Sequence, residues 1–282
     1  MEVTFSSAKQ LKGIAEALHD LVSEINVYAT GAGLSIQTMD TCHVCLVSVN
    51  LAFDDVDIFG AYSLCEEITL GVNVSNLLRA LKCAGNDDTA RMTCSSTDAL
   101  RISFESPDSP RVAEFDLKLM LIESDRFTIP PTEDAVRFKM SGALFARAIK
   151  DLAGLGDTVL IRIDRDEESA QQIMTLVCEG DIGRASIAFK TPVDLANNKR
   201  SRNKPTRFSL KHMVSIAKAS SLAEDVVLEL VDDMPLSAEF FLSAASSIKF
   251  HLAPKVTDEE DETGVTGAND VVPETQEMQD DD

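Results

Sequence analysis

The sequence predicts an α+β fold in which one unit, a single helix with a small antiparallel sheet, occurs four times. Three observations support this prediction. Four segments carry apolar residues at helical spacing, their starts lie about 66 residues apart, and each leads into a strand-like run. The 282 residues would then form either one fourfold array or two domains that each hold two units.

The helices are predicted from apolar stripes that repeat at i, i+3 and i+4. They are expected at residues 8–22, 74–84, 142–155 and 208–222. In the second helix, the apolar face is expected to consist of Leu77, Leu78 and Leu81. In the third helix, it is expected to consist of Leu144, Phe145, Ile149 and Leu152.

The remaining segments alternate apolar and polar residues over short runs, which is typical of antiparallel strands with one buried face. The strand-like runs after the helices are residues 25–40, 88–97, 157–164 and 225–232. Further strands are expected at residues 43–51, 114–120, 173–180, 184–190 and 238–244.

Cys42, His43 and Cys45 form a C-x-x-C pattern with a histidine inside it, as in some metal or redox sites. The alternation from His43 onward predicts a strand, on which Cys42 and Cys45 point to opposite faces. That arrangement is poor for shared metal ligation or for a disulfide. We therefore expect neither at this place.

The charge is unevenly distributed along the chain. Eleven acidic residues and no basic residue lie between Asp258 and Asp282, and they account for about half of the net charge of −21. This tail has no aromatic residue and no apolar periodicity, so it is expected to be disordered. The positions of the basic residues in the folded body therefore matter more than their number.

The cysteine content and the distribution of apolar residues indicate the cellular compartment in which the chain is expected. The six cysteines are scattered between residues 42 and 178, which favours reduced thiols over a dense disulfide framework. No run approaches 18 apolar residues, so no transmembrane helix is expected. The first residues show no basic segment followed by an apolar one, so no secretory signal is expected.

Basic residues recur in phase with the helices, at intervals of 67 or 68 residues between equivalent positions. These residues are Lys12, Arg79, Lys82, Arg147, Lys150 and Lys218. On one helix they would indicate only a solvated face. Recurrence on four helices predicts one shared positive surface that contacts phosphates without reading bases.

Five segments, in order along the chain, carry a resemblance to a known family. They are QTMDTCHVCLV, GVNVSNLLRALKCAGNDD, FDLKLM followed by IP, FARAIKDLAGLGDTVLI and HLAPKV. They are similar to the proliferating cell nuclear antigen family of eukaryotic DNA sliding clamps. The resemblance covers nearly the whole chain between residues 8 and 256.

The resemblance implies a closed ring of three subunits. Each subunit would have two topologically similar clamp domains, with antiparallel sheets outside and two helices inside. The expected divisions are domains at residues 1–118 and 136–257, a connector at 119–135 and the acidic tail at 258–282. Ring closure would pair the strand at 111–120 of one subunit with the strand at 181–190 of the next, although alternation alone would place both strands in sheet interiors.

Two sets of site residues follow from the resemblance. The DNA-binding positions fall on Lys12, Arg79, Lys82, Arg147, Lys150, Lys211 and Lys218. A hydrophobic pocket under the connector would bind short motifs of PIP-box type, which carry aliphatic and aromatic side chains on one helical turn. Its residues fall on Met39, His43, Val44, Leu46, Phe127, Ile129, Pro130, Pro235, Leu252, Ala253 and Pro254. For Leu46, a purely structural role in the core is the alternative.

The function implied is that of a non-enzymatic processivity factor in the nucleus. A homotrimer would encircle double-stranded DNA and tether DNA polymerases, flap endonuclease, DNA ligase and other repair enzymes after loading by an ATP-driven clamp loader. No catalytic residue, metal, cofactor or membrane partner is expected. The alternatives are a subunit of a checkpoint-type heterotrimeric clamp and an enzyme that uses the cluster around Cys42.

Some positions depart from the family or invite other interpretations. Arg165 stands where the family has the lysine that accepts ubiquitin, and His251 stands where a tyrosine is expected beside the pocket. The basic run at 197–204 is either a nuclear localisation signal or an exposed loop without a special role. Asp55 and the residues after it nearly fit a calcium loop, but Phe59 occupies an oxygen-donor position, so no calcium site is expected.

Overall fold

The structure is a computed structural model that describes residues 1–96, 98–123, 126–129, 135–166, 171–192 and 203–256. Every strand pairing within these ranges is antiparallel. Pro130, most of the basic run at 197–204 and the whole acidic tail at 258–282 lie outside the described residues.

The strands form three sheets. In spatial order, the five-stranded sheet consists of β5 (Phe59–Ser63), β1 (Glu2–Phe5), β7 (Thr89–Ser96), β8 (Ala99–Glu105) and β9 (Val112–Lys118). The eight-stranded sheet consists, in the same sense, of β10 (Val136–Ser141), β15 (Asp225–Leu230), β16 (Leu236–Phe241), β17 (Ser247–Leu252), β4 (Cys45–Ala52), β3 (Gly33–Met39), β2 (Glu24–Thr30) and β6 (Ile68–Asn73). The four-stranded sheet consists of β13 (Gly183–Pro192), β12 (Gln171–Gly180), β11 (Thr158–Asp166) and β14 (Thr206–Ser209).

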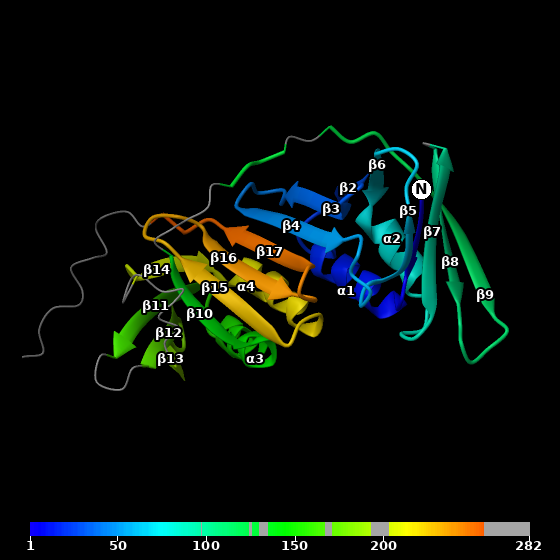
Figure 1. Ribbon diagram of the computed structural model, residues 1–282. Helices are drawn as coiled ribbons and strands as arrows, with labels where there is room; N and C mark the ends of the chain where they lie inside the picture. The colour runs from blue at the N-terminus through cyan, green and yellow to red at the C-terminus, as the bar shows by residue number, and fades with distance from the viewer. Residues whose placement is uncertain (97, 124–125, 130–134, 167–170, 193–202, 257–282) are drawn as a thin grey trace, which may run out of the picture.

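The helices form one layer, which we call the helix layer. It consists of α1 (Ala8–His19), α2 (Val74–Leu81), α3 (Gly142–Ala153), α4 (Leu210–Ala217) and the short 3₁₀ helix η1 (Lys218–Ser221). The helices lie beneath the eight-stranded sheet, with the five-stranded sheet at one end and the four-stranded sheet at the other (Figure 1). Helix η1 contacts both α1 and α3, so the layer is continuous from one half of the chain to the other.

All four predicted helices are present, but each is shorter than expected at its C-terminal end. The starts of α1 and α2 are fixed by side-chain caps: Ser7 accepts a hydrogen bond from the Lys9 N–H, and Asn73 accepts one from the Asn76 N–H. The C-terminal ends fall earlier because the last turns tighten. The α4 segment, for example, continues from Lys218 as a 3₁₀ helix.

One predicted core position in α3 is wrong. Leu144 is 51% exposed, whereas Phe145, Ile149 and Leu152 are buried as expected. The fourth buried position of this face is Ala148, which lies three residues after Phe145 and four before Leu152. The apolar stripe is therefore continuous without Leu144, whose side chain lies about 100° away from that of Phe145 around the helix axis.

The strand predicted at 43–51 begins later than expected, at Cys45. Residues 40–44, which we call the rim turn, join β3 to β4, and His43 has a positive φ of 57°. The assignment of Cys42 and His43 to strand faces is therefore wrong. Cys42 is exposed in the turn and Cys45 is buried at the start of β4, and both are free thiols.

The eight-stranded sheet joins the two halves of the chain through the pairing of β4 with β17. This ladder runs from the pair Ser247 and Asn50 to the pair Leu252 and Cys45. One face of the sheet packs on the helix layer, and the aromatic pair Phe240 and Phe250 lies in that core. The other face carries the side chains that alternate with these core residues.

Strands β9 and β13 are the end strands of their sheets. The alternation pattern predicts interior positions for both, and the sheet order corrects this. Both strands show half-buried residues alternating with exposed ones, because one face of each still packs on the core. In the isolated chain each strand therefore has one edge without a strand partner among the described residues.

The segment after β9 crosses the outer side of the molecule toward β10 (Figure 1). The Met120 N–H donates to the Gly71 carbonyl at 3.0 Å, and the Asn26 side-chain amide donates to the Ile122 carbonyl at 2.9 Å. A Cβ at Gly71 would lie 2.0 Å from the Met120 oxygen, so only glycine permits this approach. The Arg126 guanidinium lies 3.8 Å from the centre of the Tyr28 ring.

Within the described residues, no helix combines the length and the apolar character that crossing a membrane requires.

Candidate functional site

A cavity of about 810 Å³ lies between the connector and the face of the eight-stranded sheet that points away from the core. We call it the connector pocket. It is lined by Gln37, Met39, His43, Val44, Leu46, Ser48, Phe127, Thr128, Ile129, Arg137, Glu229, Val231, Met234, Pro235, Ser237, Glu239, Lys249, His251 and Ala253. Its volume lies within the range of cavities that bind ligands in proteins.

Eight of the pocket positions implied by the resemblance line this cavity. They are Met39, His43, Val44, Leu46, Phe127, Ile129, Pro235 and Ala253. Leu46 is buried, but it lies outside the core cluster and on the pocket side of β4. A purely structural role in the core, the alternative given for this residue, therefore does not describe it fully. Leu252 does not line the pocket, because strand alternation turns it into the core at 1% exposure. Pro254 is half-buried outside the lining residues.

The connector is fixed over the pocket by one glutamine. The Gln37 side chain donates a hydrogen bond to the Phe127 carbonyl at 2.8 Å and accepts one from the Phe127 N–H at 2.7 Å. A single side chain therefore replaces a strand partner for this part of the connector. Sequence analysis missed Gln37, because a polar residue on an alternating strand gives no signal of what it contacts.

Replacing Gln37 by alanine is expected to loosen the connector at Phe127. The Phe127 N–H loses its acceptor, and its hydrogen exchange should become about tenfold faster if one hydrogen bond is lost. Exchange of the Phe127 amide, followed by NMR, measures this directly. Ser35→Ala, on the same face of β3, is the matched control. An unchanged Phe127 exchange rate in the Gln37 variant would contradict the assignment.

The rim turn is organised by the carboxylate of Asp40, which is buried. It accepts hydrogen bonds from the backbone N–H groups of Cys42 at 3.3 Å, Val44 at 2.8 Å and Cys45 at 2.7 Å. His212 Nε2, from α4, lies 3.1 Å from the second carboxylate oxygen. Burial alone would raise the pKa of Asp40, but these donors outweigh it and lower the pKa below its ordinary value of 3.8.

Asp40→Ala is expected to destabilise the fold by about 2–4 kcal/mol, because three backbone N–H groups lose their acceptor. Since the folded-state pKa is lowered, the ionised carboxylate stabilises the fold above pH 3.8, and this contribution is lost as the pH falls through the folded-state pKa. Urea unfolding at pH 7 and in acid measures both effects. Asp54→Ala, at an exposed position in the turn after β4, should change the free energy of unfolding little.

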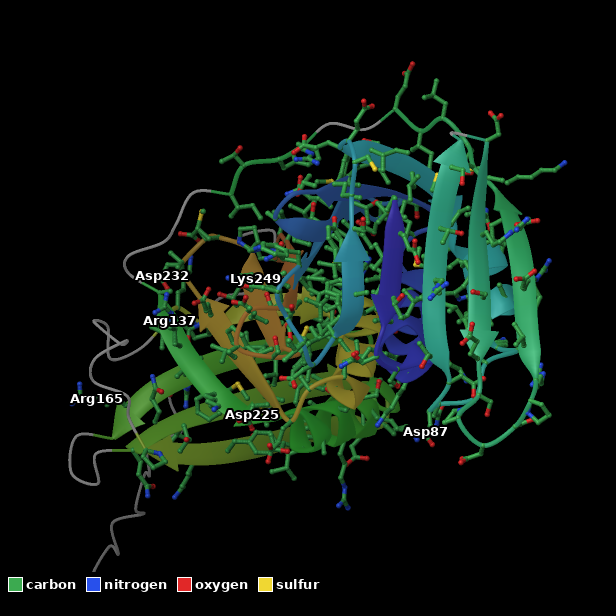
Figure 2. All side chains as sticks on the ribbon, turned by 45° about the vertical axis from the view of Figure 1, so that its right-hand side comes forward. Asp87, Arg137, Arg165, Asp225, Asp232 and Lys249 are labelled. Atoms are coloured by element: carbon green, nitrogen blue, oxygen red, sulfur yellow. The ribbon has the colours of Figure 1, made fainter. Side chains whose placement is uncertain are left out.

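The far end of the pocket floor is charged. Arg137 Nε lies 2.6 Å from Glu229, and Lys249 Nζ lies 3.3 Å from Glu229 and 3.2 Å from Glu239. Figure 2 shows Arg137 and Lys249 on neighbouring parts of this sheet face. Burial raises the pKa of Glu229, but the charges of Lys249 and Arg137 outweigh it, so the pKa is lowered and the carboxylate is ionised.

Sequence analysis missed this charged group entirely. Its members come from β10, β15, β16 and β17, and only the sheet order and register bring them together. Each residue by itself was an ordinary polar member of an alternating strand.

The cluster around Cys42 does not have the character of a reactive site. Burial and the charge of Asp40 raise the pKa of the Cys45 thiol to about 12, so it is protonated at neutral pH. Among the described residues, no group of three or more His, Cys, Asp or Glu side chains is placed to hold a metal ion. The buried, protonated Cys45 is therefore not available as a thiolate nucleophile.

The basic positions of the helix layer differ in how available they are. Arg79, Lys82, Arg147, Lys150, Lys211 and Lys218 are exposed, and Lys12 is half-buried. The Arg147 side chain is 82% exposed, and its nearest acidic partner among the described residues is Asp151, at 3.9 Å. Lys218, in contrast, forms a salt bridge with Asp20, which follows α1, so part of its charge is neutralised.

The comparisons with known proteins agree with this architecture. The family model described as "Proliferating cell nuclear antigen, N-terminal domain" matches residues 1–127, and the one described as "Proliferating cell nuclear antigen, C-terminal domain" matches residues 128–255. The proliferating cell nuclear antigen of Chaetomium thermophilum is 34% identical over 267 residues, which cover 92% of this chain and 100% of that relative. The chain therefore belongs to the proliferating cell nuclear antigen family.

Proposed function

We propose that the chain is a DNA sliding clamp that acts as a homotrimeric processivity factor in the nucleus. Family membership over nearly the whole chain is the observation that carries this proposal. The mechanism is topological: a closed ring leaves duplex DNA only by opening or by reaching an end. Tethering therefore needs no tight binding and no base reading.

Ring closure is supported by the two end strands, β9 and β13. They belong to the five-stranded and four-stranded sheets, which lie at opposite ends of the molecule (Figure 1). A contact between β9 of one copy and β13 of the next would satisfy the backbone groups of both edges. Such a head-to-tail contact gives a ring if the rotation between copies closes after three.

The DNA surface of the proposed ring is the helix layer. Its exposed basic residues lie on or directly after α2, α3 and α4, whereas Lys12 of α1 is half-buried. Equivalent cations of these helices would line the hole. Phosphate contacts of this kind are diffuse and salt-sensitive, which suits sliding. The acidic residues on the same helices, such as the exposed Glu16, keep the attraction moderate.

The connector pocket is the proposed binding site for motifs of PIP-box type. Its apolar end, formed around Met39, Leu46 and Ile129, suits the aliphatic and aromatic side chains of such a motif. Occupants of this site would be DNA polymerases, flap endonuclease, DNA ligase and other repair proteins, and a clamp loader would be a further partner of the ring. We also propose the division into domains at 1–118 and 136–257 around the connector.

The decisive experiment is polymerase processivity on primed circular DNA, with and without a clamp loader. Stimulation that requires the loader supports the proposal, and an absence of stimulation with a competent loader contradicts it. The alternative is a subunit of a checkpoint-type heterotrimeric clamp. Light scattering of the pure protein separates the two, since a stable single chain at micromolar concentration would exclude the homotrimer.

A further inference from the structure

The floor of the connector pocket changes character along one row of directly opposed residues. From the charged end to the apolar end, this row consists of Arg137, Glu229, Ser237, His251, Leu46 and Met39. A wholly apolar occupant would match only the end formed by Leu46 and Met39. The residues in the middle of the row therefore influence which side chains of an occupant fit the pocket.

His251 lies at the boundary between the two ends. Its ring is half-buried, lines the pocket and makes no hydrogen bond to another described residue. Burial and the charge of Lys249 lower the pKa of His251 below its ordinary value of 6.5, so the imidazole is neutral at pH 7. A neutral imidazole offers one N–H donor and one nitrogen acceptor to an occupant.

Ser237, the next residue along the row, is a second polar residue whose side chain lacks a hydrogen-bond partner. It is 6% exposed, and its hydroxyl is out of contact with solvent and has no hydrogen-bond partner among the described residues. A buried polar group without a partner costs free energy, so Ser237 makes the middle of the row polar, although its hydroxyl is enclosed and does not itself face an occupant.

The charged end has different requirements. Glu229 and Glu239 are already paired with Lys249, and Glu229 is also paired with Arg137. A charged group entering the pocket would have to disrupt these pairs, and burying it would add a desolvation cost. The unfilled hydrogen-bonding capacity of the His251 ring is therefore matched best by a neutral polar group at the tip of an apolar side chain.

We propose that His251 is a specificity-determining residue that makes the connector pocket prefer tyrosine over phenylalanine in the bound segment. This inference rests on the proposed motif-binding function of the pocket. A phenol ring that lies on Leu46 and points along the row spans about one strand spacing, ~4.8 Å, and brings its hydroxyl to His251. The ring fills the apolar end, and the hydroxyl supplies the missing hydrogen-bond partner.

The test uses the full chain and two synthetic peptides. Each peptide has an aliphatic residue followed three and four positions later by two aromatic residues, which are both tyrosine in one peptide and both phenylalanine in the other. Calorimetry at pH 7 gives the two dissociation constants. The tyrosine peptide is expected to bind about fivefold more tightly, as one net hydrogen bond allows.

Two substitutions identify the residue responsible. His251→Phe should abolish the preference, whereas His251→Gln, which keeps a donor and an acceptor, should retain part of it. His19→Phe makes the same substitution at an exposed position of α1 and should leave the preference unchanged. Circular dichroism and light scattering establish that each variant is folded.

The outcomes separate this inference from the function on which it rests. Equal binding of the two peptides, or a preference that survives in His251→Phe, overturns the inference alone. If neither peptide binds, the proposed role of the pocket fails and the inference fails with it. A preference that is lost in His251→Phe and partly kept in His251→Gln supports both.

Discussion

A proline at one of two neighbouring positions in β9, Ala113 or Glu114, is expected to leave the pure protein as single chains and to abolish polymerase stimulation. In an antiparallel edge strand, successive N–H groups point alternately to the neighbouring strand and outward. One of the two prolines therefore removes an outward N–H, which a second copy would need as a donor. Edge strands tolerate proline at such positions, so the chain itself should stay folded.

The measurement is light scattering combined with a processivity assay. The other proline of the pair removes an N–H that donates to β8, so it should lower the free energy of unfolding. This loss of stability identifies which of the two N–H groups points toward β8. Prolines at Gly60 and Ala61, in the end strand β5 of the same sheet, control for edge proline as such. If both β9 variants are folded and still trimeric, the proposed ring contact is wrong.

Charge reversal of Arg147 and Lys150 together is expected to weaken the attraction between the helix layer and the phosphates of DNA inside the proposed ring. Both residues are exposed on α3, and three copies would place six altered charges around the hole. We expect at least a tenfold loss of loader-dependent stimulation near 100 mM salt and a flatter dependence on salt, because fewer phosphate contacts release fewer counterions.

The control is a double reversal on strands outside the helix layer, Arg91→Glu with Arg162→Glu, which changes the net charge equally. That variant should keep most of its stimulation and its salt slope. Processivity assays at several salt concentrations compare the two. Equal losses in both variants would mean that overall charge matters and that the helix surface has no special role.

The helices show what local sequence can predict and where it stops. The starts of α1, α2 and α3 were predicted correctly, because an apolar stripe is a local signal, whereas α4 begins two residues later than expected, at Leu210. Leu144 was wrongly assigned to the buried face because it is apolar and lies next to Phe145 in the sequence. Only the packing of the helix shows that Ala148 is buried and Leu144 is exposed. The rim turn was missed because its geometry depends on the Asp40 carboxylate and not on alternation.

The candidate site also contains residues that could be predicted from the sequence and residues that could not. Apolar lining residues such as Met39 and Ile129 followed from the resemblance, and the structure places them in one cavity. Gln37 and the charged residues of the floor could not be predicted, because their roles depend on partners 10 to more than 90 positions away in the sequence. The end-strand positions of β9 and β13 were equally hidden, since alternation is the same at an edge and in an interior.

The ladder of β4 and β17 makes the outer wall of each chain mechanically stiff. Its six residue pairs lie where the two halves of the chain meet, so bending the chain there would rupture several backbone hydrogen bonds at once. Elastic deformation of the proposed ring would then concentrate at the three seams between copies. Each copy would move as a rigid arc, and the loader would need to part only one of three equivalent seams.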